Sequence, residues 1–154
     1  MAIVRWNRFG PPILGIGIQP HPLQGPGHCH GRAGKRVDTA FDKKTGEKKW
    51  ETKAGGLNSS WSTPVLVRVN DERTDLVIAV PYEIWGLNPN NGKLRWYCDA
   101  IETEQFQSSL VAKDGVVYAI EGRGGGSIAV RAGGVDNVTD THVLWSGRDS
   151  NRYG

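Results

Sequence analysis

The chain has 154 residues, of which 38% are hydrophobic and 23% are charged, a composition typical of a globular domain rather than a disordered chain. No apolar run approaches the roughly 20 residues of a membrane-spanning helix. The net charge of +3 is uneven, because residues 1–38 hold five Lys/Arg against one acid (+4) and the remainder holds 14 against 15 (−1). Since nucleic-acid binding needs a concentrated basic face, we expect no nucleic-acid partner.

The first 38 residues contain 7 Gly, 5 Pro and 3 His, and they show neither strand alternation nor a helical period. Arg5 and Arg8 precede an apolar stretch at residues 13–18, but this stretch is short, follows two prolines and lacks a small-x-small cleavage site, so no signal peptide is predicted. We interpret residues 1–38 as an irregular leader that is disordered or not native to the fold, for example the product of a shifted frame or a wrong start. Ordered strands in this segment would contradict a non-native origin.

From about Thr39 the chain alternates apolar and polar residues almost to its end, which predicts an internal boundary at 38/39 and one patterned domain over residues 39–154. This domain contains a repeat. Residues 40–50 (AFDKKTGEKKW) align with residues 86–96 (GLNPNNGKLRW), 46 positions later. A degenerate third copy ends at Trp145, 49 positions after Trp96. A period in the forties is the length of one four-stranded propeller blade.

Each copy reads as a hairpin, in which Asp or Asn opens the turn, Gly supplies a positive φ angle and the outgoing strand carries a Trp. The sequence between the hairpins supplies the remaining strands, and turn residues such as Lys113-Asp114-Gly115 separate them. No segment after residue 39 shows a helical period. The predicted strands of two full units span residues 63–69, 76–80, 83–87 and 94–97, and then residues 108–112, 116–120, 127–130 and 143–145.

Ala40, Asp42, Thr45, Gly46 and Trp50 resemble the AxDxxTGxxxW signature of the pyrroloquinoline-quinone (PQQ)-like repeats, and residues 87–96 are similar with Asn in place of Asp and Thr. The resemblance covers residues 39–154. It implies an all-β fold, a β-propeller with blades of four antiparallel strands, in which the repeated Trp docks adjacent blades. Complete propellers of this family have six to eight blades.

The chain holds about two and a half such blades, beginning with half a blade at residues 39–52. An incomplete ring leaves blade faces and edges open, because propellers protect them by radial closure. Two arrangements satisfy this requirement: the chain is a fragment of a longer propeller, or several copies assemble into one ring. The expected partners are therefore other blades or copies of the chain itself.

The PQQ-dependent dehydrogenases share this repeat, and their resemblance implies a Ca²⁺ site, an Asp base and commonly a disulfide between adjacent cysteines. Here Cys29 and Cys98 are 69 positions apart, which fits no metal or redox spacing, and two free thiols are favoured over one disulfide. No acidic cluster forms an oxygen cage for Ca²⁺. Asp42 belongs to the repeat turn, so we expect a structural role for it. We predict no catalytic, cofactor-binding or metal site.

Other motifs also favour plain structural interpretations. His28-Cys29-His30 lacks the spacers of a metal site. Residues 122–127 (GRGGGS) resemble a phosphate-binding loop but lack the Gly-Lys-Ser/Thr ending and join two strands, which predicts a hairpin loop. Asp99, Glu102 and Glu104 indicate a solvated acidic loop. Two glycosylation sequons, Asn58-Ser59-Ser60 and Asn137-Val138-Thr139, match by pattern only.

Every strong motif is thus structural, which predicts a non-enzymatic propeller scaffold that binds protein or polysaccharide partners. The alternatives are a fragment of a PQQ-dependent oxidoreductase, which would oxidise alcohols with a dye acceptor when Ca²⁺ and PQQ are added, or a sensor domain of a larger protein. The resemblance to the family implies a periplasmic or extracellular location.

Overall fold

The computed structural model of the chain describes residues 2–6, 37–42, 45–53, 60–121 and 125–148. This part is nearly all β, as predicted, and it divides into two compact units. Unit 1 comprises residues 1–55 with residues 90–92, and unit 2 comprises the rest. The described part of the chain contains no helix that is long and apolar enough to cross a membrane.

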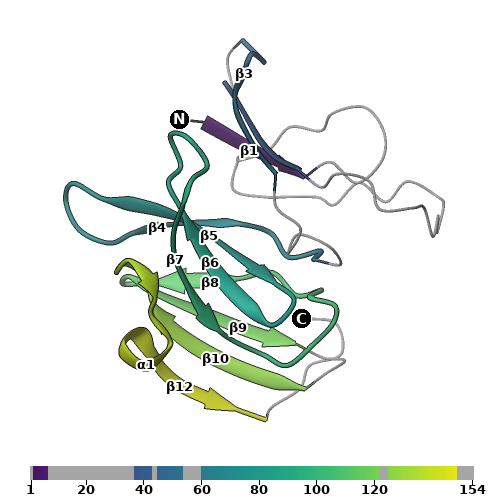
Figure 1. The fold of residues 1–154 in the computed structure, drawn as a ribbon, viewed down its shortest axis with the longest axis vertical. Coiled ribbons are helices and arrows are strands. Elements are labelled where there is room, and N and C mark those ends of the chain that lie inside the picture. Colours follow the sequence, from purple (N-terminus) through teal and green to yellow (C-terminus); the bar gives the residue numbers. More distant parts are fainter. Residues whose placement is uncertain (1, 7–36, 43–44, 54–59, 122–124, 149–154) are drawn as a thin grey trace, which may run out of the picture. The chain divides into compact units, whose positions relative to one another are not determined.

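Unit 1 contains a three-stranded antiparallel sheet in the order β1-β2-β3, formed by Ala2–Trp6, Val37–Asp42 and Lys48–Lys53 (Figure 1). Strands β2 and β3 are the predicted half blade. Strand β1 corrects the interpretation of residues 1–38, because a strand stands inside the segment expected to be irregular. Its β-branched and aromatic residues favour a strand, but five residues before a Gly/Pro-rich stretch show too little alternation to be recognised.

The presence of β1 argues against a non-native origin for residues 2–6. Residues 7–36 lie outside the described residues. The predicted boundary at 38/39 falls within β2, whereas the two compact units divide near residue 55. The 38/39 boundary is not a division between units because β2 pairs with β1 on one side and with β3 on the other. This pairing places the first strand of the repeat in one sheet with the strand before it.

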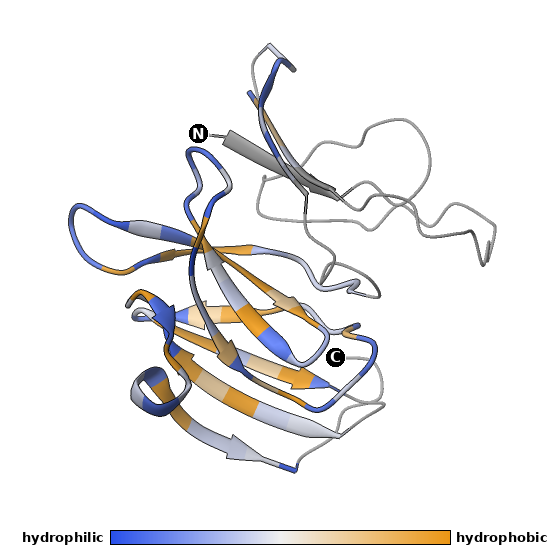
Figure 2. Ribbon diagram, viewed as in Figure 1, coloured by the Kyte–Doolittle hydropathy of each residue, from blue (hydrophilic) through white to orange (hydrophobic). Residues whose placement is uncertain are grey.

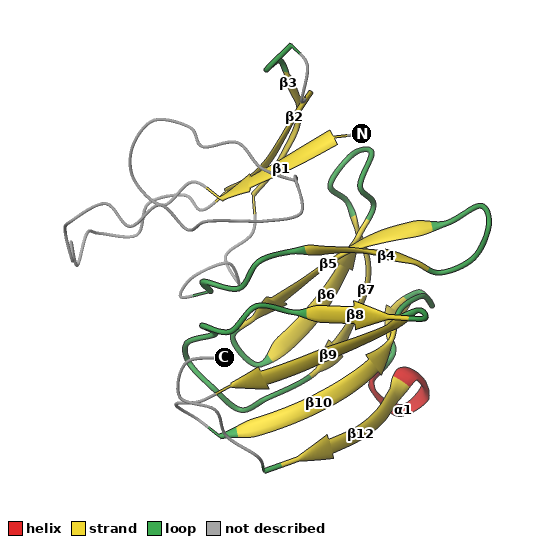
Figure 3. Ribbon diagram, turned by 180° about the vertical axis from the view of Figure 1, so that it is seen from behind, coloured by secondary structure: helices red, strands yellow, loops and turns green. Residues whose placement is uncertain are grey.

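Unit 2 contains two sheets (Figures 1 and 3). The first sheet has the order β11-β7-β6-β5-β4, and the second has the order β12-β10-β9-β8. Apart from β11, all of these strands pair antiparallel with their neighbours, as the four-stranded blades of a partial propeller. In chain order the strands are β4 (Val65–Arg68), β5 (Thr74–Val80), β6 (Glu83–Leu87), β7 (Leu94–Asp99), β8 (Val111–Lys113), β9 (Val116–Glu121), β10 (Gly126–Arg131), β11 (Asp136–Asn137) and β12 (Val143–Gly147).

The eight predicted strands of the two full units are all present. The β8–β9 turn has φ angles of 52° at Asp114 and 77° at Gly115, the backbone geometry that the Asp-Gly pair indicated. Beyond the predicted elements the structure adds β11 and one four-residue helix, α1 (Thr139–His142). A single helical turn is too short to produce a helical period in the sequence.

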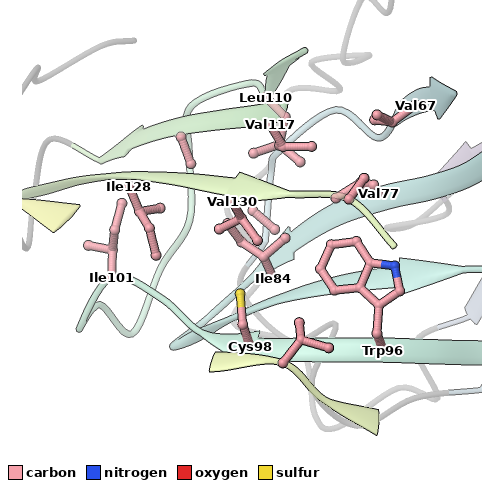
Figure 4. Close-up of a cluster of buried hydrophobic side chains, with 14 of the residues drawn as sticks. Val67, Val77, Ile84, Trp96, Cys98, Ile101, Leu110, Val117, Ile128 and Val130 are labelled. Atoms are coloured by element: carbon pink, nitrogen blue, oxygen red, sulfur yellow. The ribbon is translucent and has the colours of Figure 1, made fainter. Parts of the chain in front are cut away.

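The main hydrophobic core of unit 2 lies between its two sheets (Figure 4). Figure 2 shows that apolar residues concentrate on the strands of both sheets, while polar residues occupy the connecting turns. Each large side chain that is fully buried here contributes about 1.5–3 kcal/mol to folding. The first sheet supplies Val67, Val77, Ala79, Ile84, Trp96 and Cys98, and the second supplies Val117, Ala119, Ile128 and Val130.

The repeat is visible as one recurring cross-strand pair. Ala40 pairs with Trp50, Gly86 with Trp96 and Ala129 with Trp145, and in each case the register shifts directly after the small residue. The first two turns also share a hydrogen bond, from the amide of Asp42 to the carbonyl of Glu47 and from that of Asn88 to that of Lys93, both 2.8 Å. The three copies are therefore equivalent residue by residue around the Trp.

The third copy differs by its length. Its small residue and its Trp are 16 positions apart, whereas those of the first two copies are 10 apart, so the third connection is longer by 16 − 10 = 6 residues. The β10–β12 connection (residues 132–142) contains β11 and α1. This insertion explains why only the Trp of the third copy was recognisable in the sequence.

Candidate functional site

The acidic residues that stood out in the sequence lie apart from one another within the described part of the chain. Asp42 lies in the turn between β2 and β3, where its carboxylate accepts a hydrogen bond of 3.1 Å from the amide of Thr45. Glu102 and Glu104 are exposed in the loop after β7, as predicted, whereas the exposed Asp99 is the last residue of β7 and pairs with Glu83. Within the described residues, no group of three His, Cys, Asp or Glu side chains could hold a metal ion.

The glycine-rich segment leads from β9 into β10, two antiparallel neighbours, so it is a hairpin connection and not a strand-to-helix loop. Residues 122–124 of that segment lie outside the described residues, as do His28-Cys29-His30 and the first two positions of the Asn58 sequon. The Asn137 sequon is described. Its Asn137 accepts a hydrogen bond of 2.9 Å from the amide of Thr139, where β11 meets α1.

Cys98 is a buried free thiol in the core between the two sheets. Burial raises its pKa to about 12. A thiol in this position is not available to a neighbouring cysteine or to a ligand at the surface. The described residues therefore do not fit the disulfide and Ca²⁺ site that a PQQ-dependent dehydrogenase would place around its quinone.

The described residues contain a buried polar cluster that the sequence did not reveal. Asp75 on β5 is fully buried, and its carboxylate accepts bonds of 3.0 Å from Nε and from Nη2 of Arg73, together with one from Nη1 of Arg95. Trp96 Nε1 adds a bond of 2.7 Å. Burial by itself would raise the pKa of Asp75, but the hydrogen bonds from these three side chains outweigh it and hold the pKa below the ordinary value.

Glu121, at the end of β9, is a second buried carboxylate. It accepts hydrogen bonds from the amides of Gln107 and Ser108, of 2.6 and 3.4 Å, in the segment that leads into β8. Both buried acids thus bind groups of their own unit, which is the normal condition for a charge inside a protein. These contacts stabilise the two blades.

The strongest surface feature is the outer face of the second sheet, which we call the open face. It carries a row of residues in cross-strand register, Val111, Tyr118, Ala129 and Trp145. Three of these are large and exposed, at 64% for Val111, 39% for Tyr118 and 49% for Trp145. Neighbouring positions such as Val117 and Val130 point the other way, into the core, because side chains alternate along a strand.

The equivalent row of the first sheet is Val65, Val77, Gly86 and Trp96. Val77 and Trp96 are fully buried there, in the core that the second sheet covers. The same row of the repeat is therefore covered in one blade and exposed in the next. An exposed row of large apolar side chains is a typical feature of interaction surfaces.

A shallow depression of about 520 Å³ lies between the β4–β5 turn and the β8–β9 turn. Its charged side chains are Arg68, Asp71, Lys113, Asp114 and Arg131. They are exposed and of both signs, and Arg68 already pairs with Asp71. Because charges of both signs line this depression, its charge does not favour one class of ligand over another.

Among solved structures, the chain is similar to that of "The crystal structure of BamB from Moraxella catarrhalis". The two are 19% identical, with a TM-score of 0.53, over 73% of this chain and 31% of the BamB chain. This likeness supports a propeller-like fold, and it extends over less than a third of the BamB chain. No protein-family model and no curated protein matches the chain.

Proposed function

We propose that this chain is a non-enzymatic β-propeller scaffold that binds other proteins, and that the open face is its binding surface. One observation carries this proposal: the row that includes Tyr118 and Trp145 is exposed, while the equivalent row with Val77 and Trp96 is buried under the following sheet. Blades pack face to face. The open face thus presents the row that, in the preceding blade, is covered by a neighbouring sheet.

The chemistry of the open face favours a protein partner with a flat aliphatic surface. Tyr118 and Trp145 offer large apolar rings at a low cost in side-chain entropy, which is why such residues are frequent anchors in interfaces. The surface that they fit is another β-sheet of small apolar side chains. The second sheet itself presents such a surface to the first, with Ala119, Ile128 and Val130.

The non-enzymatic part of the proposal is supported by the roles of the buried reactive groups. Asp75 and Glu121 bind groups of their own unit, and Cys98 is enclosed in the core. We also propose a periplasmic or extracellular location, on the basis of the resemblance of residues 39–154 to PQQ-like repeats.

The test is the oligomeric state of the purified chain, since in a solution of the pure protein the available β-sheets belong to other copies. We expect the mass measured by analytical ultracentrifugation to rise with protein concentration. Tyr118→Thr and Trp145→Thr should each weaken this self-association at least about tenfold, because a buried aromatic anchor typically contributes more than ~1.4 kcal/mol to an interface.

Val135→Thr is the matched control, because Val135 is also an exposed apolar residue, at 69%, but lies outside the open face. All three changes affect exposed positions and should alter the free energy of unfolding by about 0.5 kcal/mol or less. A chain that remains monomeric at every concentration would overturn the proposal. So would self-association that is equally strong in all three variants.

A further inference from the structure

The outer edge of the first sheet is covered by a strand that comes from the following blade. Strand β11, in the β10–β12 connection, pairs in parallel with β7, with Asp136 opposite Trp96 and Asn137 opposite Tyr97. The amide of Val138 donates a bond of 2.9 Å to the carbonyl of Tyr97. The amide of Asp99 in turn donates a bond of 2.9 Å to Oγ1 of Thr139. Backbone groups at the outer edge of β7 thus form hydrogen bonds with a short extended segment.

Strand β12 occupies the same position in the second sheet that β7 occupies in the first. Both are last in the antiparallel order, and both pair their Trp with a small residue followed by a register shift. Trp145 is therefore equivalent to Trp96, and Ser146 is equivalent to Tyr97. Counting onward in the same way, Arg148 corresponds to Asp99.

The edge of β12 differs from that of β7 in one respect. In the part of the chain that the structure describes, β12 pairs with β10 on one side and with no strand on the other. Because the N–H and C=O of one strand residue point the same way, Ser146 should present both groups to the outer edge, as Tyr97 presents its carbonyl to Val138. Leu144, Trp145 and Ser146 are exposed.

We propose that the outer edge of β12 binds an extended segment of a partner protein as a parallel strand, in the manner in which β7 binds β11. This inference rests on the proposed role as a protein-binding scaffold, but it uses the backbone edge of β12 and not the open face. Strand addition of this kind obtains its affinity from main-chain hydrogen bonds.

The geometry at β7 also indicates the chemistry of the partner segment. It needs an amide donor for the carbonyl of Ser146, followed directly by a hydroxyl side chain that accepts from the amide of Arg148, as Val138 and Thr139 do at β7. An Asn two residues before that hydroxyl residue orders the turn, as Asn137 does for Thr139. An extended Asn-x-Thr or Asn-x-Ser segment meets these requirements.

The probe is a synthetic peptide with the sequence of residues 133–142, titrated into the ¹⁵N-labelled full chain and followed by the amide chemical shifts. We expect saturable shifts at Ser146, Gly147 and Arg148. The same peptide with an N-methyl group on the residue that corresponds to Val138 lacks the donor, so it should bind at least tenfold more weakly. This comparison needs no change to the protein.

Ser146→Pro removes the outward N–H, and a proline is tolerated on an edge strand where the N–H faces solvent. It should weaken binding at least tenfold, whereas Ser146→Ala, which keeps the N–H, should bind within about twofold of the original chain. Tyr118→Thr, a variant of the open face, should leave peptide binding unchanged even where it reduces self-association. The two proposals can therefore fail separately.

Three results would overturn the inference: no shifts on β12 at saturating peptide, equal binding of the N-methylated peptide, or shifts confined to residues 97–99. The last result would mean that the peptide displaces β11 from β7 and does not bind β12.

Discussion

The indole nitrogen of Trp96 on β7 donates a hydrogen bond of 2.7 Å to Asp75 on β5, across the strand that lies between them. That strand is β6, and the residue of β6 opposite Trp96 is Gly86. A Cβ atom at Gly86 would lie 2.0 Å from Cε2 of the indole. The ring therefore lies directly against the backbone of β6, and only glycine leaves room for it.

Gly86→Ala should destabilise the chain by about 1–3 kcal/mol or more, because the indole must move and weaken its bond to Asp75. Urea unfolding followed by Trp fluorescence measures the change. The reverse substitution at the equivalent position of the second sheet, Ala129→Gly, is the control and should cost only about 0.5–1 kcal/mol, the usual effect of glycine in a strand. Equal stability of Gly86→Ala and the original chain would contradict this account of the contact.

Asp75→Asn should be strongly destabilising, by about 3 kcal/mol, because it leaves Arg73 and Arg95 without their carboxylate while both are only 26% exposed. Asp71→Asn is the matched control. Asp71 also pairs with an arginine, Arg68, but its side chain is 94% exposed, so its loss should cost about 0.5 kcal/mol or less. Urea unfolding compares the two, and similar costs would show that the buried cluster contributes no more than a surface pair.

The same cluster predicts a dependence of stability on pH. The pKa of Asp75 in the folded chain lies below its ordinary value of 3.8. Its contribution to stability is therefore complete above that value and is lost as the pH falls through the lower pKa of the folded chain. Between about pH 5 and about pH 2 the original chain should lose more stability than Asp75→Asn does, and parallel losses would exclude Asp75 as a source of the acid sensitivity.

Cys98 should resist modification in the folded chain, because its pKa of about 12 leaves very little thiolate at neutral pH and its sulfur is buried. In a Cys29→Ser background, reaction with a thiol reagent near pH 8 should be on the order of 100- to 1,000-fold slower than in urea. Equal rates in the folded and unfolded chain would contradict the burial of Cys98.

The fold could be predicted from the sequence because its signals are local. Alternation of apolar residues, the Asp-Gly turn at residues 114–115 and the repeated distance from Ala40 to Trp50 and from Gly86 to Trp96 each act within one hairpin. These features identified the β2–β3 half blade and both full blades. No catalytic or metal site was predicted from the sequence.

The parts that were missed depend on contacts between residues far apart in the chain. Asp75 is one charged residue in an apolar strand, and nothing near it in sequence indicates that Arg95 and Trp96 would meet it 20 and 21 positions later. Strand β11 has two residues and pairs with β7 about 40 positions earlier, so it carries no alternation of its own. The open face depends on which rows of the repeat a neighbour covers, and sequence alone does not state this.

Because β11 pairs with β7, completion of the first blade of unit 2 depends on synthesis of the second. During synthesis β7 emerges about 40 residues before the strand that covers its edge, so the first blade of unit 2 cannot complete its hydrogen bonding until most of the second has left the ribosome. The first blade is thus finished by the second. A nascent chain from which β7 has emerged but β11 has not presents an edge strand whose outer backbone groups have no partner, which is a state prone to aggregation.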